Sequence, residues 1–476
     1  MCLDFQPDVV IDIRDWWMME YQQRSAFRDF YKWVIMPTVD SKPQQEQYIN
    51  TYLSADGVLT YSEFGKDVLE EDSNGFINVA GVASPGANFD YFKPTTNKEQ
   101  HKDAMGFVDG TNIIGTVMRN QRRKLYPNLI ASFREMLDKN PSLQKNTFLY
   151  IHTAFPDLGW DIPYFIKKYN MGNHALFTYK CRSCEYFFPS FYQDSVAVCP
   201  KCSRGATMPT TAFGLSDQEL SSIINCFDLY VQYSICEGFG MPQVEAAACG
   251  VPVVTVDYSA MSSVGKKIKS DFVSVASYFW DSPTQSQRAI PNDKELIERM
   301  ESFLKLPQSM KIKKGMDAYM GARRSYNWDK CAKVWEEYLD SIETIGHHQG
   351  WGSKPKVREA PKNIPENLTN SDFVEWGMRN IVGIKEDRSA YIESRLIKDL
   401  NNGQSTIFGQ DLFYDECSYI STQQSHAPFT IEDAIEKMNF MREYKNKWEI
   451  NRSEYIKNNG WTRESMPEFI KYAKKK

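Results

Sequence analysis

The sequence predicts an α/β fold built from two consecutive series of parallel β-α units, followed by a helical tail. Short β-branched runs alternate with helical stretches in two successive parts of the chain. A segment rich in Lys and Pro, residues 350–366, then precedes a region with apolar residues at helical spacing. Because strands that are separated by helices pair in parallel, we expect helices to cover both faces of each sheet.

Composition limits the class of protein. A chain of 476 residues exceeds one ordinary domain, and 42% hydrophobic with 25% charged residues is typical of a chain that buries a core. The net charge of −5 argues against binding nucleic acid by bulk electrostatics. No apolar run reaches the roughly 20 residues of a membrane span, and the start of the chain carries Asp4 and lacks the basic region of a signal peptide. We therefore expect a soluble, cytoplasmic protein without transmembrane segments.

The first series occupies residues 1–95. The expected strands are residues 8–13, 33–36, 57–61 and 76–80. Helices are expected over residues 44–54 and from a cap at Ser62 to near Glu70. The Gly- and Pro-containing stretch 84–94 and the polar residues up to 109 are interpreted as a loop and linker.

The second series occupies residues 96–345. Its expected strands are residues 112–117, 147–151, 175–178, 229–232 and 252–256, the third of them interrupted afterwards by a cysteine-containing segment. Its expected helices are residues 128–137 and 217–226, the latter opened by a capping box of Ser216 and Glu219.

The tail is divided into a linker at 346–366 and a helical C-terminal extension at 367–476, with helices over 371–381, 389–400 and 430–448. A packed helical appendage is the preferred interpretation of the tail; acceptor capture and partner docking are the alternatives.

One segment of the second series carries the most informative pattern, a strand that ends in a glycine turn followed at once by a helix. Gly238 and Gly240 let the backbone approach a ligand closely. Pro242 suits the first helical turn and Gly250 the end of the helix. The free amides and the positive end of such a helix favour phosphate. Glu245, about one turn further on, can accept two hydrogen bonds from a ribose diol. The alternative is an ordinary strand–turn–helix with surface glutamates.

Glu237 and Glu245 lie eight positions apart, and with Glu-Ala-Ala-Ala-Cys-Gly-Val-Pro-Val-Val they resemble the E-x7-E element of the family 4, or group 1, glycosyltransferases. The resemblance covers most of residues 5–345. It implies a GT-B fold, in which two Rossmann-like domains face each other across a cleft, with the donor on the C-terminal domain and the acceptor mainly on the N-terminal one. It also implies a terminal helix over residues 325–338 that crosses back to the first domain.

The implied activity is retaining transfer of a sugar from a nucleoside-diphosphate sugar to an unidentified acceptor. The resemblance makes Glu237 the catalytic residue, which orients the donor sugar or stabilises its developing positive charge. The implied donor-binding residues of the same segment are Gly238, Phe239, Gly240, Met241 and Glu245.

A second match lies in residues 114–124, which resemble the strand and the Arg/Lys loop of the same family. The resemblance implies that Arg119 and Lys124 hold the diphosphate. Breaking the anomeric bond leaves charge on the nucleoside diphosphate, and fixed Arg and Lys groups must stabilise this charge when no divalent ion is bound. Arg122 and Arg123 are interpreted as solvated neighbours.

The chain departs from the family at its start. The family's N-terminal domain begins with a strand and a Gly-rich loop well before the segment that matches residues 7–11, so roughly half of this Rossmann-like domain is expected to be missing. A late-starting fragment, completion by a partner polypeptide and loss of transfer activity are three interpretations. The family's histidine in this region has no clear counterpart, and Arg14 and Asp15 occupy the corresponding loop.

Four cysteines form a CxxC-x14-CxxC pattern within residues 179–206. Four thiolates at this spacing can surround Zn²⁺ tetrahedrally and leave no position for water, so the prediction is a structural zinc ribbon inserted in the donor domain. The expected ligands are Cys181, Cys184, Cys199 and Cys202. Four unrelated buried cysteines are the alternative. Bracing a long loop is the preferred role of the insertion, and a surface for the acceptor or a partner is the other.

Two further functions are weighed. The first is a catalytically silent sugar-nucleotide-binding subunit that depends on a partner. The second is a nucleic-acid-associated protein that uses the zinc ribbon, which the acidic balance disfavours. The expected ligands are structural Zn²⁺ and a UDP-sugar or GDP-sugar donor; the sugar, the base and the acceptor are not specified by the sequence.

Overall fold

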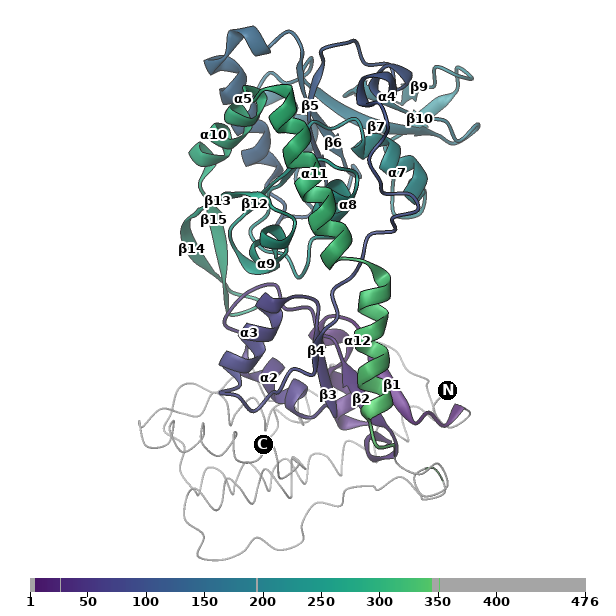
Figure 1. The fold of residues 1–476 in the computed structure, drawn as a ribbon, viewed down its shortest axis with the longest axis vertical. Helices are drawn as coiled ribbons and strands as arrows, with labels where there is room; N and C mark the ends of the chain where they lie inside the picture. The colour runs from purple at the N-terminus through teal and green to yellow at the C-terminus, as the bar shows by residue number, and fades with distance from the viewer. Residues whose placement is uncertain (1–4, 26, 194–195, 345–350, 352–476) are drawn as a thin grey trace, which may run out of the picture.

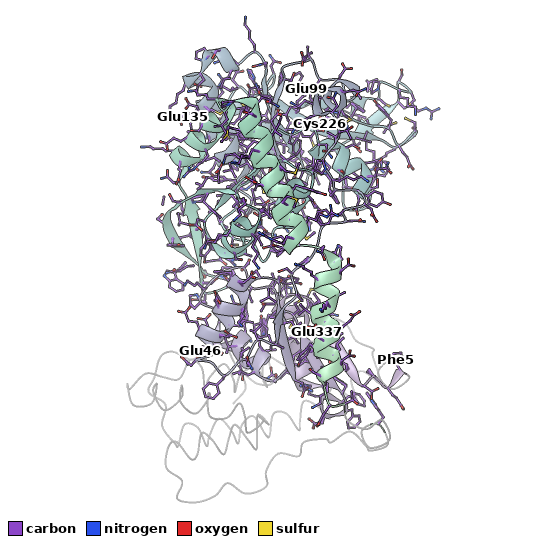
Figure 2. All side chains as sticks on the ribbon, in the orientation of Figure 1. Phe5, Glu46, Glu99, Glu135, Cys226 and Glu337 are labelled. Carbon is purple, nitrogen blue, oxygen red and sulfur yellow. The ribbon has the colours of Figure 1, made fainter. Side chains whose placement is uncertain are left out.

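The computed structural model describes residues 5–25, 27–193, 196–344 and 351. In Figure 1 these residues form two α/β units, one above the other, and helix α12 (Trp328–Ser341) runs from the upper unit down along the lower one. Glu46 and Glu337 mark the lower unit in Figure 2, and Glu99 and Glu135 mark the upper one. The helices predicted at 371–381, 389–400 and 430–448 lie outside the described residues, as does all of the linker except Trp351.

Within the described residues, the lower unit contains a sheet of four parallel strands in the order β1-β2-β3-β4. The strands are β1 (Val9–Asp12), β2 (Lys32–Ile35), β3 (Gly57–Thr60) and β4 (Gly81–Val82). The helices that connect the last three strands are α2 (Glu46–Leu53) and α3 (Glu63–Asp72). Ser62 caps α3 by accepting a hydrogen bond from the Gly65 amide. The first three predicted strands and both predicted helices are confirmed.

Three short 3₁₀ helices connect β1 to β2 and were not predicted: η1 (Trp16–Met18), η2 (Glu20–Arg24) and η3 (Arg28–Phe30).

The strand predicted at 76–80 is wrong, because β4 begins only at Gly81. The amide of Ile77 donates to Ser73 Oγ at 2.9 Å and that of Val79 to Glu70 Oε1 at 3.4 Å. Side chains at the end of α3 therefore take these amides, and the backbone ladder with β3 starts at Ala80.

The upper unit contains, among the described residues, a nine-stranded sheet in the order β13-β12-β11-β5-β6-β7-β10-β9, with β8 paired to β7. Its six parallel strands are β5 (Asn112–Val117), β6 (Thr147–His152), β7 (Ala175–Cys181), β11 (Leu229–Gln232), β12 (Val253–Val256) and β13 (Asp271–Val273). Its antiparallel strands are β8 (Phe187–Phe191), β9 (Ala197–Val198) and β10 (Gly205–Thr207). The predicted strands of this series are confirmed, except that β7 continues to Cys181 instead of stopping at residue 178.

Helices cover both faces of this sheet. They are α4 (Lys98–Ala104), α5 (Tyr126–Lys139), α6 (Ile162–Lys168), α7 (Asp217–Ile224), α8 (Met241–Ala248), α9 (Ser259–Lys267), α10 (Asp293–Leu304) and α11 (Gln308–Ser325). Successive strand residues enter different apolar clusters: Ile114 packs in the cluster with Phe133 of α5, whereas Ile113 packs in the cluster with Val244 of α8. This alternation is what a sheet buried on two faces requires.

Helix α4 corrects the interpretation of residues 95–109 as a linker. Asn97 caps the helix by accepting from the Gln100 amide. Lys102 is buried, and its Nζ donates to Asp228 Oδ2 at 2.8 Å. A polar sequence thus forms a helix because one of its lysines has a buried carboxylate partner.

A helix and a hairpin are among the elements that connect the upper unit to the lower one. Helix α12 packs Val334 and Tyr338 over Gly81 and Gly57, where a side chain would collide with them; this confirms the predicted helix. The hairpin of β14 (Val275–Asp281) and β15 (Ser286–Pro291) was not predicted, and the amide of Gln287 in it donates to Lys42 O at 2.9 Å. None of the helices in the described part of the chain combines the length and apolarity needed to cross a membrane.

Candidate functional site

The strand order locates the site before any side chain is considered. From β5 the chain moves outward through β6 and β7, and it later returns to the other side of β5 at β11. In parallel sheets, ligands bind beyond the carboxyl ends of the strands where the order reverses. Those ends are followed here by residues 118–125 and 233–240. Both segments that the sequence singled out therefore meet at one point of the sheet.

Glu237 is the centre of this meeting point, and only 5% of the residue is exposed. Lys124 Nζ contacts its Oε1, and Arg123 Nη1 donates to its Oε2 at 2.7 Å. Gln232 Nε2 donates to Oε1 at 2.9 Å. The structure therefore brings together Glu237 and Lys124, two of the residues that the sequence singled out. It contradicts the interpretation of Arg123 as a solvated neighbour, whereas Arg122 is exposed.

Backbone contacts hold the two loops in register. Lys124 and Ser234 form an isolated β-bridge, and Ser234 Oγ donates to Arg123 O at 3.1 Å. The Glu237 amide donates to Ser259 Oγ at 3.0 Å. The carboxylate and its cations are thus fixed by backbone structure on both sides, which is the preorganisation that a charge-stabilising site requires.

The charge of Lys124 depends on this pairing. Burial lowers the pKa of the Lys124 ammonium, and the neighbouring Arg123 guanidinium lowers it further. The Glu237 carboxylate in contact with the ammonium favours the charged form. A ligand anion could replace that carboxylate as the partner of Lys124 without leaving a buried charge unpaired.

Arg119 belongs to the same loop as Lys124 but makes a different contact. Its Nε donates to Asp157 Oδ2 at 2.9 Å and its Nη2 to Asp157 Oδ1 at 3.2 Å. The Arg119 side chain is half-exposed. The third guanidinium nitrogen, Nη1, takes no part in this contact and can meet an anion.

The start of α8 has the predicted conformation. Gly240 is the N-cap with φ of +86°, a value that favours glycine, and Pro242 lies in the first turn. Gly250, with φ of +72°, follows the helix. A Cβ at Gly238 would lie 2.7 Å from Thr38 Cγ2, so the lower unit reaches the turn between Glu237 and the helix.

Phe239 is buried in the α8 side of the core, in edge-to-face contact with Tyr326, and Met241 packs at the margin of the same cluster. Both side chains thus anchor the turn and the start of α8. The first backbone amides of a helix have no partner within the helix.

Glu245 lies on α8 and is partly buried. Burial raises the pKa of its carboxyl group to about 7, with a further contribution from Asp217 at the start of α7. A contact between Ser221 Oγ of α7 and Cys249 Sγ, 3.7 Å apart, also connects α7 to the end of α8. A group with this pKa changes its charge near neutral pH.

Asp40 and Arg288 are site residues that the sequence did not reveal. Arg288 Nη1 donates to Asp40 Oδ1 at 2.6 Å and to Cys236 Sγ at 2.9 Å. This contact connects the loop after β2, the hairpin and the residue before Glu237. Because the two charged residues are 248 positions apart, no local pattern relates them. Arg14, by contrast, pairs with Asp12 in its own unit, with Nε 3.1 Å from Oδ1.

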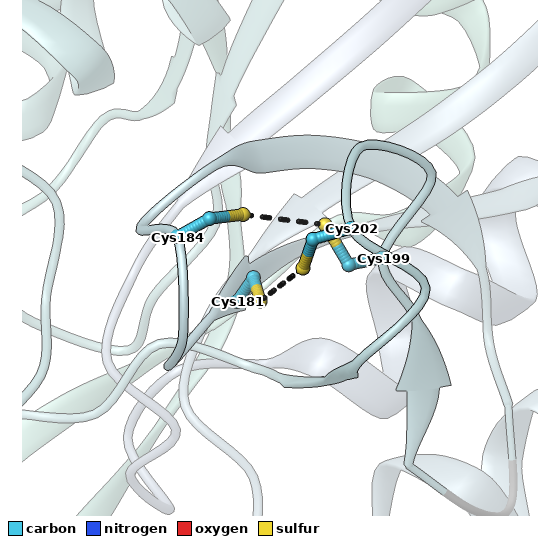
Figure 3. Close-up of side chains that lie close together, drawn as sticks. All are labelled: Cys181, Cys184, Cys199 and Cys202. Atoms are coloured by element: carbon cyan, nitrogen blue, oxygen red, sulfur yellow. Dashed lines mark hydrogen bonds between the residues drawn. The ribbon is translucent and has the colours of Figure 1, made fainter.

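The four predicted cysteine ligands converge, as Figure 3 shows, and their sulfur atoms all lie within 4.8 Å of one another. The sulfurs of Cys181 and Cys202 are 3.5 Å apart, and those of Cys184 and Cys199 are 3.7 Å apart. A disulfide would bring two sulfurs to about 2.05 Å. Tetrahedral Zn²⁺ with Zn–S bonds of about 2.3 Å separates its sulfurs by about 3.8 Å. The arrangement therefore fits a four-thiolate zinc site.

Comparison with known proteins agrees with this geometry. Residues 210–312 match the family model described as "Glycosyl transferases group 1", a range that includes Glu237 and α8. No curated protein matches the chain.

Among solved structures, the sucrose-phosphate synthase (tll1590) of Thermosynechococcus elongatus is 15% identical, with a TM-score of 0.51 over 71% of this chain and 75% of that one. A glycosyltransferase from Rickettsia africae ESF-5 is 14% identical, with a TM-score of 0.50 over 72% and 79%. Anabaena Alr3699/HepE in complex with UDP and glucose is 13% identical, with a TM-score of 0.50 over 70% and 78%. The chain has the α/β, Rossmann-like GT-B fold, and the segment similar to the group 1 family model lies in its upper unit.

Proposed function

We propose that this protein is a retaining glycosyltransferase that moves a sugar from a nucleoside-diphosphate sugar to an acceptor. One observation carries the proposal: the buried Glu237 carboxylate contacts the Lys124 ammonium and the Arg123 guanidinium at the switch point of the sheet, directly before α8. Cleavage of the bond between the anomeric carbon and the diphosphate develops both signs of charge, so a carboxylate beside two cations supports the proposal. The group 1 match over the same segment supports the assignment.

The donor is proposed to lie with its diphosphate against the first turn of α8. The amides of Gly240 and Met241 and the positive end of the helix favour an anion there. Lys124 supplies a buried cation, and Arg119 supplies a more exposed one through Nη1. Glu245 accepts hydrogen bonds from the ribose hydroxyls. A UDP-sugar or a GDP-sugar is the expected donor.

The reaction is proposed to proceed on one face of the donor sugar. The bond from the anomeric carbon to the diphosphate breaks, and the acceptor oxygen bonds to the same carbon from the same side. The acceptor proton passes to the departing phosphate oxygen. Glu237 stabilises the positive charge that develops on the sugar, and Lys124 and Arg123 stabilise the negative charge on the leaving group. No second carboxylate is required, unlike in glycosidases.

A panel of sugar nucleotides tests this function. Thermal shift should identify a UDP-sugar or GDP-sugar that raises the melting temperature, because a ligand of the folded state stabilises it. Incubation with that donor should release nucleoside diphosphate, and NMR of a transferred sugar should show the anomeric configuration of the donor. Glu245→Ala is the binding control. Binding without hydrolysis or transfer would overturn the catalytic assignment and favour a silent subunit.

Donor affinity is expected to rise with pH through about 7, because the ionised Glu245 accepts both ribose hydrogen bonds. Burial raises the pKa of Glu245 to about 7. The carboxyl group is therefore protonated at acidic pH and becomes ionised as the pH rises through about 7. Calorimetric titration of UDP-glucose or GDP-mannose between pH 5.5 and 8.5 (conditions chosen to bracket about 7) measures this effect. These diesters lack the phosphate ionisation near pH 6 that would complicate free nucleotides. Glu245→Gln should flatten the profile; an unchanged profile in this variant would contradict the role of Glu245.

We also propose that the four cysteines hold one structural zinc ion, which the convergence of their sulfur atoms supports. Metal analysis of the purified chain should find about one zinc per chain. Cys202→Ser should lose the metal and lower the melting temperature, whereas Cys226→Ser, which changes a buried cysteine outside the cluster, should retain it. Zinc absent from the wild-type chain, or retained in full by Cys202→Ser, would contradict the site.

A further inference from the structure

We propose that the four-cysteine centre positions the loop of residues 208–216, here called the Phe213 loop, against the nucleoside end of the donor site, so that metal binding sets nucleotide affinity. The inference rests on the proposed function and extends it. Its basis is a set of contacts that leads from the cysteine cluster to α7 and from α7 to Cys249, the residue that follows α8. The Phe213 loop connects β10 to α7, and it lies between those two endpoints.

The cluster is built into the strand that precedes the loop. Cys181 is the last residue of β7 and pairs with Ala206 of β10, while Lys180 pairs with Thr207. Cys199 and Cys202 flank the turn between β9 and β10. Thiolates from β7 and from the turn before β10 therefore converge, and one metal held by them would fix the register from which the Phe213 loop departs.

Lys180 connects β7 to the far end of the loop. Its side chain is buried, and Nζ donates to Gly214 O at 3.2 Å and to Glu219 Oε2 at 2.9 Å. The same carboxylate oxygen accepts from the Ser216 amide at 2.7 Å, within the capping box of α7. One lysine beside the first metal ligand thus holds both the loop backbone and the start of α7.

Phe213 is held by two cations. Lys180 Nζ lies 5.3 Å from the centre of its ring, and the Arg182 guanidinium carbon lies 5.4 Å from it. Arg182 is in the first CxxC turn, between two of the cysteines of the cluster. Metal binding would therefore fix one of the two cations that hold the ring.

The loop ends beside the donor site. Asp217, the first residue of α7, is close enough to Glu245 of α8 to raise the pKa of its carboxyl group. Ser221 Oγ and Cys249 Sγ lie 3.7 Å apart, which also connects the two helices. Displacement of the Phe213 loop would move the start of α7 relative to Glu245, whereas Lys124 and Arg123 would keep their contacts with Glu237.

This geometry predicts a selective effect. Without the metal, the loop must be ordered when the donor binds, and that ordering subtracts from the affinity. The loss should affect ligands that contain the nucleoside and spare inorganic pyrophosphate, which needs only the start of α8 and the cations. Lys180 and Arg182 act as positioning residues and contact no reacting atom.

Calorimetry tests the inference. The affinities for UDP, GDP and inorganic pyrophosphate are measured for the metal-loaded chain, the metal-free chain and the Arg182→Met variant. The matched control is Lys201→Met, which removes a cation from the second CxxC turn that faces Tyr186 instead of Phe213. Arg182→Met should weaken the nucleotide that binds by about two- to fivefold, the equivalent of one exposed cation–π contact. Metal removal should weaken it more. The nucleotide affinity of Lys201→Met should equal that of the wild type. The pyrophosphate affinity should be the same for every form of the chain.

Zinc content and melting temperature should be equal in the wild type and Arg182→Met, and in steady state the donor KM of this variant should rise at constant kcat. Unchanged nucleotide affinity in both Arg182→Met and the metal-free chain would overturn the inference and leave the proposed function intact. An equal loss for pyrophosphate would also overturn it, because the damage would then extend to the whole site. Failure of the metal-loaded wild type to bind either nucleotide would overturn both.

Discussion

Replacement of Glu237 by Gln is expected to lower kcat for sugar transfer by about 10²–10³-fold, the loss found when one preorganised charge-stabilising group is removed from an active site. The amide keeps the size of the side chain but cannot stabilise positive charge on the sugar. Affinity for UDP or GDP should stay equal or increase, because Lys124 and Arg123 lose the carboxylate that competes with the diphosphate. Steady-state kinetics with calorimetry of the same variant measures both effects.

The stability of this variant supplies the control. Glu237→Gln leaves the buried Lys124 ammonium without its carboxylate and should lower the free energy of unfolding. The double variant with Lys124→Met removes both charges and should recover part of that loss. Wild-type kcat in Glu237→Gln would contradict the catalytic role, and a fall in nucleotide affinity would contradict competition between Glu237 and the diphosphate.

Lys124→Met is expected to weaken UDP or GDP binding by about 10- to 100-fold, because a charge-assisted hydrogen bond contributes roughly 1.5–3 kcal/mol. The fold should be less affected, since Arg123 and Gln232 continue to pair with Glu237. Arg119→Ala should have a smaller effect in the same direction, because its side chain is half-exposed and its charge is screened by solvent.

The matched control is Arg122→Met, which removes an exposed cation from the same loop and should leave affinity within about twofold. Calorimetric titration of the variants gives the comparison. Unchanged affinity in both Lys124→Met and Arg119→Ala would count decisively against a diphosphate at this position.

Much of the fold could be predicted because local sequence rules and tertiary packing agree in the α/β units. The β-branched runs of β5, β6 and β12 are buried, and Ser62 and Ser216 begin their helices through the expected side-chain caps. The predictions failed where a distant partner decided the structure. Helix α4 depends on the buried contact of Lys102 with Asp228, which lies 126 positions away.

The candidate site divides in the same way. The glycine turn, the start of α8 and the cysteine spacing are local patterns, so they could be recognised from the sequence. The sequence did not show which of the adjacent cations, Arg123 or Lys124, pairs with Glu237. In the structure both do, and both residues are held by contacts with Ser234. Asp40, Arg288 and the Lys180 contacts depend on tertiary packing.

A crystal structure of the zinc-loaded chain soaked with the nucleoside diphosphate chosen by thermal shift locates the diphosphate relative to Lys124 and α8. We expect phosphate oxygens within hydrogen-bond distance of the Gly240 or Met241 amide and of Lys124 Nζ, with the ribose hydroxyls on Glu245. A nucleotide bound elsewhere, or Lys124 still paired only with Glu237 while nucleotide is present, would contradict it.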